Sequence, residues 1–455
     1  MTVIEQVVEK NWCVGCGMCA AVCPNERLEI RWNDRGEYNP KVIQGSTDCG
    51  ANCSLCYEIC PAHGQTKNET EIGQELYAEI PEIQHTPQAG YWLNSYVGYS
   101  NEHRLDSASG GIATWLLERL LVSGEVDAIA AVGRTDCPDK LFEFKICETI
   151  KQIRACSRSA YYPVEVSRVI RYFLDNDGRY AIIGLPCVCK AIRLAQDKFP
   201  VLRKRIKYVL GLTCGHTCSK FFAEYICALG GGNPHKLNEF IFRTKDLSQP
   251  ASNLGMTFRA GQGADEVAKQ VLWRDGVGEA FTNSYFQLPG CFYCDDIFAE
   301  CADAVFMDAW LPEYARQPEG HTIALIRAVQ IRNLLVDGES QGTLSLCDLT
   351  LKATISSQQG VVERKRFRVV NFDDEPIKRN ELLRKPRVFQ FLLGTLYRSC
   401  GKVTPEKWPM ADKNLLEFNQ LIRPILWKIL IVQKLRKITS LPLRAVRKIY
   451  KLSGG

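Results

Sequence analysis

The sequence predicts a chain of mixed α+β and α/β class in three parts: a small cysteine-rich module, a larger α/β region and a basic helical tail. Three observations support this prediction. Eight of the 21 cysteines lie within the first 60 residues, short apolar strands alternate with helices from about residue 96, and apolar runs alternate with basic residues after residue 414. A chain of 455 residues is long enough for about three domains.

The N-terminal cysteines form two quartets, and each quartet ends in a Cys-Pro pair. The first has the C-x2-C-x2-C-x3-C-P spacing that holds a cubane 4Fe-4S cluster, and the second has one extra residue in its first gap. The pattern resembles bacterial two-cluster ferredoxins, in which the last cysteine of each quartet binds the other cluster, so one-electron transfer is expected. The two expected ligand sets are Cys13, Cys16, Cys19 and Cys60, and Cys49, Cys53, Cys56 and Cys23.

Two other uses of these cysteines fit less well. Structural zinc prefers two C-x2-C pairs per tetrahedral site, and disulfides need an oxidising compartment, whereas no secretory segment opens the chain. We therefore expect a cytoplasmic protein. Its net charge of +6 comes from the tail, because residues 428–455 hold eight basic residues and no acidic one, which leaves −2 for the rest of the chain.

Residues 66–94 are polar with little apolar periodicity, and they are expected to form a surface linker. From Tyr96 the sequence pattern becomes that of a β-α-β unit: the strand V-G-Y-S, a helix that starts in S-A-S-G-G-I-A-T, and the buried strand V-D-A-I-A-A-V-G. The alternation then continues with a helix around Val164 to Leu174, a strand at Tyr180 to Gly184, a helix from about Cys189 to Lys198, a strand at Tyr208 to Leu212 and a helix from about Ser219 to Leu229.

Such alternation predicts an α/β domain whose ligand sites lie past the carboxyl ends of its strands. S-A-S-G-G, which opens a helix at residues 107–111, could offer backbone N–H groups to a phosphate, although a simple helix cap explains the motif equally well. No G-x-G-x-x-G follows a strand, so a nicotinamide-binding Rossmann domain is not indicated. Pro186-Cys187 and Cys214-Gly215-His216 are expected at two further strand ends.

A second group of cysteines suggests a third cluster. The C-F-Y-C motif has metal-ligand spacing, and the preferred ligands are Cys187, Cys214, Cys291 and Cys294. Two alternatives stay open: the C-x2-C pair could hold zinc, and Cys187 or Cys214 could be catalytic or structural. The expected buried thiols are Cys189, Cys218 and Cys301.

The order of motifs resembles the family of coenzyme F420 hydrogenase/dehydrogenase beta subunits, from about residue 8 to residue 370. The landmarks after the cysteine module are S-A-S-G-G-I-A-T, G-L-P-C, G-L-T-C-G-H, C-F-Y-C-D-D, A-D-A-V-F-M-D-A-W, L-S-L-C-D and S-S-Q-Q-G-V-V-E-R-K-R. The resemblance implies an oxidoreductase that contains FAD and iron-sulfur clusters and passes electrons between a ferredoxin or deazaflavin coenzyme and another acceptor. Relatives include reductases of chlorophyll-pathway pigments.

The resemblance also implies site residues. The FAD phosphates and ribityl group would lie at Ser107, Ser109, Gly110, Gly111 and Thr114, and the four preferred cysteines of the third cluster match family positions. Asp308 and Trp310 match a G-D-x-W landmark in which Met307 replaces glycine, which puts the local backbone in doubt, and Cys189 stands where many relatives have glutamine.

His216 is the one candidate proton donor, because it follows Cys214 at a strand end and histidine is the side chain suited to proton transfer near neutral pH. A structural loop histidine is the alternative. Flavin would couple one-electron clusters to a two-electron substrate. The expected domains are a ferredoxin-like module (1–65), the linker (66–94), the family's N-terminal α/β domain (95–178), its C-terminal domain (179–370) and an extension with amphipathic basic helices (371–455).

In residues 414–452, Lys428 interrupts the longest apolar run well short of the ~20 residues that span a bilayer. The apolar face could therefore pack on the protein itself, on a partner or on a membrane surface, and nucleic acid is not expected. Three functions remain: an oxidoreductase that acts on a small organic substrate, a non-catalytic relay subunit of a larger redox complex, and a metal-organised redox sensor or scaffold.

Overall fold

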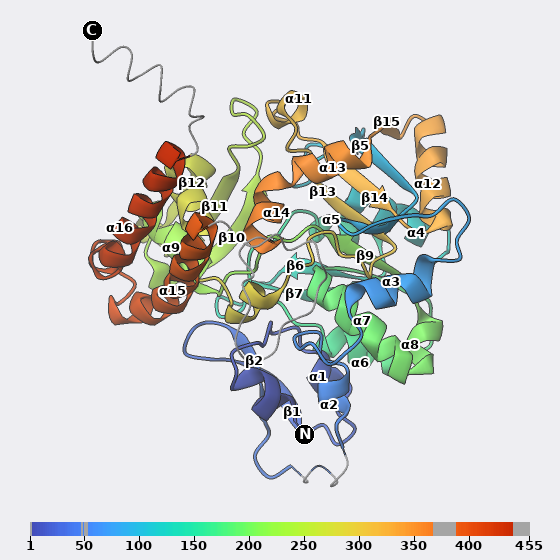
Figure 1. Ribbon diagram of the computed structural model, residues 1–455, viewed down its shortest axis with the longest axis horizontal. Coiled ribbons are helices and arrows are strands. Elements are labelled where there is room, and N and C mark those ends of the chain that lie inside the picture. Colours follow the sequence, from blue (N-terminus) through green and yellow to red (C-terminus); the bar gives the residue numbers. More distant parts are fainter. Residues whose placement is uncertain (1, 47–48, 50–52, 367–387, 440–455) are drawn as a thin grey trace.

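The computed structural model describes residues 2–46, 49, 53–366 and 388–439, and a mixed eight-stranded sheet lies at its centre (Figure 1). The strands β6, β8, β9 and β13 run parallel, and the outer pairings are antiparallel. In spatial order the sheet contains β15 (Leu344–Asp348), β5 (Asn94–Ser100), β14 (Thr322–Ile326), β13 (Ala304–Asp308), β9 (Ile206–Leu212), β8 (Tyr180–Gly184), β6 (Ala128–Arg134) and β7 (Phe142–Cys147).

Helices cover both faces of this sheet, which is why its central strands are apolar on both sides. Along β9, Val209 faces one core and Leu210 faces the other, as the two-residue alternation of a strand requires. One face carries α4 (Ile112–Val122), α5 (Ile150–Ala155) and α12 (Val329–Ser340). The other carries α6 (Ser167–Asp175), α7 (Pro186–Lys198) and α8 (Pro200–Arg205).

The strands and helices expected between residues 95 and 229 are present, with one correction at a helix start. We expected Pro186-Cys187 to end a strand, but these residues form the first turn of α7, because proline is well tolerated at the first helical position. The carboxyl ends of β8, β9 and β13 still meet at one edge of the sheet, since these three strands are parallel neighbours.

The N-terminal module packs against α6 and α7 below the sheet (Figure 1). The amide of Val166 donates to the carbonyl of Cys16 at 2.8 Å, and Glu165 fills the space beside Gly17, whose φ of +83° suits glycine. The module's elements are η1 (Ile4–Val8), α1 (Met18–Ala21), β1 (Leu28–Trp32), β2 (Tyr38–Val42) and α2 (Leu55–Glu58).

The segment 66–94 is not the plain linker that its composition predicted. It contains α3 (Glu69–Tyr77), which begins with a capping box, and the hairpin β3 (Gln84–Thr86) and β4 (Gly90–Trp92). The fully buried Arg327 donates to the carbonyls of Ala89 and Tyr91, so this segment is fastened to the end of β14.

A second core lies beside the main sheet and was not predicted. It joins an antiparallel sheet of β10 (Leu237–Thr244), β11 (Gly255–Ala260) and β12 (Val267–Leu272) to α9 (Phe221–Leu229) and α10 (Val277–Thr282). The remaining elements near the site are η5 (Pro289–Tyr293), α11 (Pro312–Ala315), α13 (Leu351–Ser357) and α14 (Gln359–Arg366).

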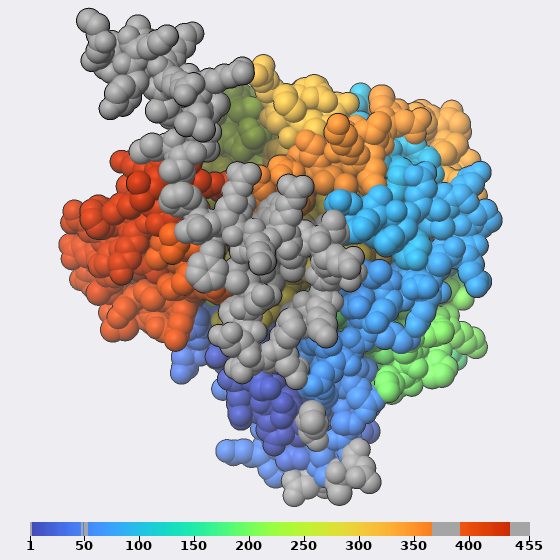
Figure 2. All heavy atoms as spheres, in the orientation of Figure 1, coloured from blue at the N-terminus to red at the C-terminus, as the bar shows by residue number. Residues whose placement is uncertain are grey.

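The C-terminal helices α15 (Val388–Met410) and α16 (Leu415–Thr439) pair with each other and pack on the second core, where they form a lobe at one side of the molecule (Figure 2). Trp408 is fully buried and donates to Glu224 at 2.9 Å. Within the described part of the chain, no helix is both long and apolar enough to cross a bilayer. The basic residues Arg444, Arg447, Lys448 and Lys451 lie outside the described residues.

Candidate functional site

The first expected ligand set comes together in the N-terminal module. Burial raises the pKa of the Cys19 thiol well above its usual range, and the nearby sulfurs of Cys16, Cys13 and Cys60 raise it further. Cys60 is far from the other three in the sequence, and it reaches them because α2 brings the chain back to α1. We call Cys13, Cys16, Cys19 and Cys60 the first thiol group.

The second expected set is also brought together in the module. Burial raises the pKa of Cys56, and the sulfurs of Cys49, Cys53 and Cys23 add to the effect. Cys49 and Cys53 are only half-buried. We call these four residues the second thiol group.

A third thiol group lies at the edge of the sheet where β8 and β9 end. It contains Cys187 on α7, Cys214 after β9, and Cys291 and Cys294 at η5. Burial raises the pKa of Cys187 well above its usual range, and the sulfurs of Cys214, Cys16, Cys294 and Cys291 contribute. Because Cys16 belongs to the first thiol group, the first and third groups are neighbours.

The third group has a buried cation, which lies in the S-S-Q-Q-G-V-V-E-R-K-R landmark but had no role assigned from the sequence. Lys365 on α14 places its ammonium 3.3 Å from Cys294 Sγ and donates to the carbonyl of Asp296 at 2.6 Å. Burial works against its charge, but the sulfurs of Cys294, Cys214 and Cys291 prevail and raise the pKa of Lys365. A fixed positive charge here would stabilise thiolates and any anionic cluster that they hold.

The chemistry of all three groups suits iron-sulfur clusters. All 21 cysteines are free thiols, so disulfides do not explain why these twelve gather in fours. Buried thiols such as those of Cys19 and Cys187, whose pKa values are raised, are neutral by themselves, and metal coordination would remove their protons. The expected buried thiols Cys189, Cys218 and Cys301 are fully buried. Burial raises the pKa of Cys218, and the nearby sulfurs of Cys291 and Cys214 contribute to this rise.

A cavity of about 620 Å³ opens between the module and the α/β region beside the third thiol group. Cys187, Cys294 and Pro61 line its inner side, and Lys190 and Glu69 form an ion pair at 3.5 Å in its wall. This volume lies in the range of small-molecule sites.

The S-A-S-G-G segment precedes α4, but its polar groups have partners within the protein. The amide of Gly110 donates to Thr322 Oγ1 at 2.8 Å, and Ser109 Oγ donates to the carbonyl of His321 at 2.5 Å. A Cβ on Gly110 would lie 2.5 Å from the carbonyl oxygen of Gly98. These glycines are therefore needed for close backbone packing, and the expectation of exposed N–H groups does not hold at Gly110. Ser107 and Thr114 lie 3.3 Å apart through their hydroxyls.

Cations, not free amides, surround this segment. Arg243 pairs with both oxygens of Asp308 at 2.5 and 2.7 Å and donates to the carbonyl of Ala108, and its buried Nε has no hydrogen-bond partner. Lys245 donates to the carbonyls of Ser109 and Glu319 at 2.7 and 2.6 Å. Burial, together with the neighbouring charges of Arg243, Arg158 and Arg104, lowers the pKa of Lys245 to about 7.

Neither Arg243 nor Lys245 belongs to a recognisable sequence motif. Arg243 lies in β10 and Lys245 directly after it, about 135 residues beyond S-A-S-G-G in the sequence. Only the structure shows this juxtaposition. Met307 lies in β13 with ordinary strand geometry, so no glycine-like backbone is needed there.

His216 is buried, and its ring stacks on Phe281 with centroids 3.9 Å apart. Arg364 Nη1 lies 3.4 Å from its Nδ1. The ring therefore has a packing role, and its catalytic role stays a prediction.

Comparison with known proteins agrees with these features. The model of the N-terminal part of the coenzyme F420 hydrogenase/dehydrogenase beta subunit matches residues 95–171, and the model of the C-terminal part of the same protein matches residues 177–352. A 4Fe-4S dicluster domain matches residues 12–63.

Two curated relatives carry names from this family. The coenzyme F420-dependent sulfite reductase of Methanocaldococcus jannaschii is 21% identical over 71% of this chain and 45% of its own length. One subunit of the F(420)H(2) dehydrogenase of Methanosarcina mazei is 23% identical over 46% of this chain and 55% of its own. The chain thus spans about half the length of these relatives.

A chain of the F420-reducing nickel-iron hydrogenase complex from Methanosarcina barkeri superimposes with a TM-score of 0.46 and 16% identity, over 62% of this chain and 92% of that one. The two family models together extend over most of the α/β region. The chain belongs to the family of coenzyme F420 hydrogenase/dehydrogenase beta subunits and carries an N-terminal 4Fe-4S dicluster domain.

Proposed function

We propose that this chain is an iron-sulfur flavoprotein oxidoreductase that passes electrons between reduced ferredoxin, or an F420-type deazaflavin, and a small organic substrate. The observation that carries the proposal is the succession of three thiol groups, in which Cys16 of the first lies beside Cys187 of the third. The second group lies in the N-terminal module and the third lies at the sheet edge, so electrons received by the module would end beside the 620 Å³ cavity.

The residues around S-A-S-G-G fit the anionic part of FAD. Arg243 with its buried, unpartnered Nε, together with Lys245 and Arg104, would hold a diphosphate beside Ser109. The pocket there encloses only about 20 Å³, so side chains must move to admit it. FAD would supply the exchange between one-electron and two-electron steps. The protein's own residues would position the phosphates and, at His216, hold a proton.

Purification without oxygen tests the proposal. We expect about twelve iron and twelve sulfide per chain, as three 4Fe-4S clusters require, together with one FAD. Reduced ferredoxin and reduced deazaflavin, each tried as donor, should bleach the flavin absorbance. Colourless protein without acid-labile sulfide would refute the proposal, and zinc in place of iron would favour the scaffold function.

The relay function is separated from catalysis by the same preparation. The name of one relative, a dehydrogenase subunit, suggests a partner redox subunit. If the clusters and the flavin are reduced but no organic acceptor is turned over by the chain alone, the chain is a relay for such a partner.

We also propose that α16 docks on an anionic membrane surface. Trp427 is 65% exposed and Leu430 is 47% exposed, and Lys428 and Lys434 lie exposed beside them. An exposed aromatic and aliphatic face flanked by lysines is typical of helices at the membrane interface. Co-sedimentation with phosphatidylserine vesicles, and not with phosphatidylcholine vesicles, is the expected result. Equal sedimentation with both would refute charge-driven docking.

A further inference from the structure

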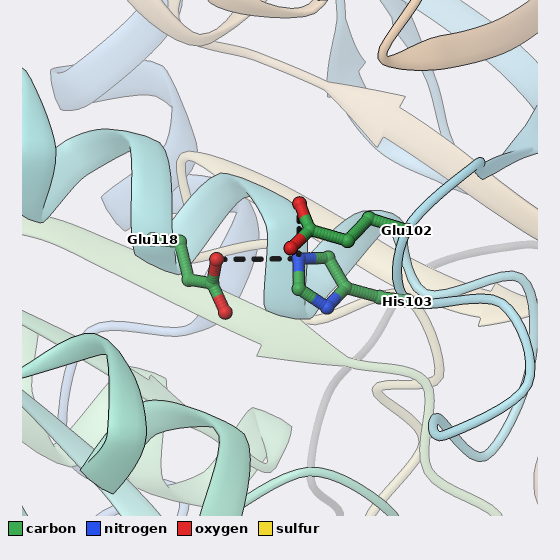
Figure 3. Close-up of side chains that lie close together, drawn as sticks. All are labelled: Glu102, His103 and Glu118. Carbon is green, nitrogen blue, oxygen red and sulfur yellow. Dashed lines mark ion pairs between the residues drawn. The ribbon is translucent and has the colours of Figure 1, made fainter.

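Three side chains outside the thiol groups converge beside α4. Glu102 and His103 follow β5, and Glu118 projects from α4. His103 Nε2 lies 3.3 Å from Oε2 of Glu118 and 3.8 Å from Oε2 of Glu102, and Figure 3 shows the imidazole ring directed at both carboxylates. One atom from each residue lies within 4.8 Å of the other two.

Burial makes this cluster unusual. His103 is 4% exposed and Glu118 is 7% exposed, and the buried Nε2 of His103 has no hydrogen-bond partner. A buried nitrogen that makes no hydrogen bond and lies beside two carboxylates is a position at which a bound cation would satisfy all three groups. Glu102 is exposed, so the cluster is open to solvent on one side.

Arg154 contacts both carboxylates and fixes their orientation. Its Nε donates to Oε1 of Glu118 at 2.8 Å, and its Nη2 contacts Oε1 of Glu102. The Oε2 atoms of both carboxylates are thereby turned toward His103. Nη2 of Arg154 also lies 3.1 Å from Oε2 of Glu118, so this oxygen would contact both Arg154 and a bound ion. Partners that fix the outer oxygens of ligating carboxylates are a regular feature of metal sites.

We propose that Glu102, His103 and Glu118 bind one divalent first-row transition-metal ion, such as Mn²⁺ or Zn²⁺, with water completing the coordination. Ligand atoms about 2.1 Å from a tetrahedral ion lie roughly 3.4 Å apart, which is close to the separation between His103 and Glu118. An imidazole with two carboxylates suits these ions better than calcium or magnesium, which prefer oxygen alone.

The ion would brace the segment beside it. A Cβ on Gly111 would lie 2.8 to 2.9 Å from atoms of His103, and the amide of Ser107 donates to the carbonyl of His103 at 3.1 Å. The metal site would therefore fix the start of S-A-S-G-G. Its existence does not depend on the proposed redox function, because none of its ligands belongs to a thiol group.

Manganese binding to the intact protein, followed by the EPR signal of free Mn²⁺, tests the site. Mn²⁺ is the better probe because it favours oxygen and nitrogen ligands over the thiolates of a partly loaded cluster. The protein is treated with EDTA, desalted and titrated without oxygen. We expect one bound Mn²⁺ per chain, and binding at least about tenfold weaker in His103→Gln, since loss of even an outer-shell partner costs about 10–100-fold.

His235→Gln is the matched control, because His235 is an exposed histidine with one carboxylate, Asp412, 3.3 Å away. It should bind Mn²⁺ like the wild type. Glu102→Gln provides a second test at an exposed position if His103→Gln does not fold, and unchanged iron and sulfide verify the fold of each variant. If the wild type binds no Mn²⁺ at millimolar concentration, or if both site variants bind as it does, the cluster is only an ion pair and the proposal fails.

Discussion

Lys365→Met tests the electrostatic design of the third thiol group. The Lys365 ammonium lies 3.3 Å from Cys294 Sγ, so its charge would be about 5–6 Å from the centre of a cluster held there. At an effective dielectric constant of 20, one unit charge at that distance interacts with an added electron by about 3 kcal/mol, which is ~130 mV for a one-electron couple. Because reduction adds negative charge, removal of the ammonium should lower the reduction potential by up to this amount.

The assay is an EPR-monitored redox titration of the anaerobically purified protein. Lys365→Arg should keep most of the potential, since it retains the charge. Lys352→Met is the matched control, because Lys352 lies exposed on α13. Iron and sulfide contents must equal those of the wild type for the comparison to hold. A shift under about 20 mV, or a shift to higher potential, would refute the reasoning that Lys365 sets the potential of this cluster.

Three further predictions concern other parts of the molecule. Lys245 has a pKa of about 7, so it is charged below that pH and neutral above it, and affinity for inorganic pyrophosphate should fall by up to ~tenfold per unit as pH rises above 7; calorimetry of Lys245→Met should show no such slope, and a wild-type affinity constant from pH 6 to 9 would contradict this. Gly110→Ala should reduce the free energy of unfolding by about 1–3 kcal/mol and so lower Tm, because the added Cβ would collide with backbone atoms that cannot move aside. Gly360→Ala, which has open space around it, should leave Tm unchanged. Equal Tm values for the two variants would be inconsistent with the packing. Trp408→Ala should cost about 3–5 kcal/mol in chemical unfolding and Trp408→Phe clearly less, and a neutral Ala variant would show that α15 is not anchored there.

Sequence reasoning worked where the signal was local. The strand Tyr180–Gly184 is an uninterrupted apolar run, and the structure has it with the same bounds, because a strand buried on both faces carries such a run. The cysteines that spacing and the ferredoxin resemblance grouped also lie near one another, and the clusters that they would hold stay a prediction. By contrast, α3 was missed because its nine residues contain few apolar side chains, although the capping box of Asn68 and Glu71 was readable in the sequence.

The rest depended on contacts between distant segments. Nothing near Arg243 or Lys365 in the sequence shows that one faces Asp308 and the other faces Cys294. The second core escaped prediction for the same reason, because its strands and the C-terminal helices are joined only in space. Such contacts result from topology, which periodicity cannot supply.

The way in which the N-terminal module is attached has a consequence for kinetics. Its backbone is bonded to the residue before α6 and its helices pack on α6 and α7, while α3 and the hairpin after it are fastened by Arg327. In the described part of the module, these contacts hold it directly against the α/β region, so the proposed electron transfer to the third thiol group would need no movement of the module. If this internal transfer limits turnover, the rate should therefore not change when glycerol or sucrose raises the solvent viscosity.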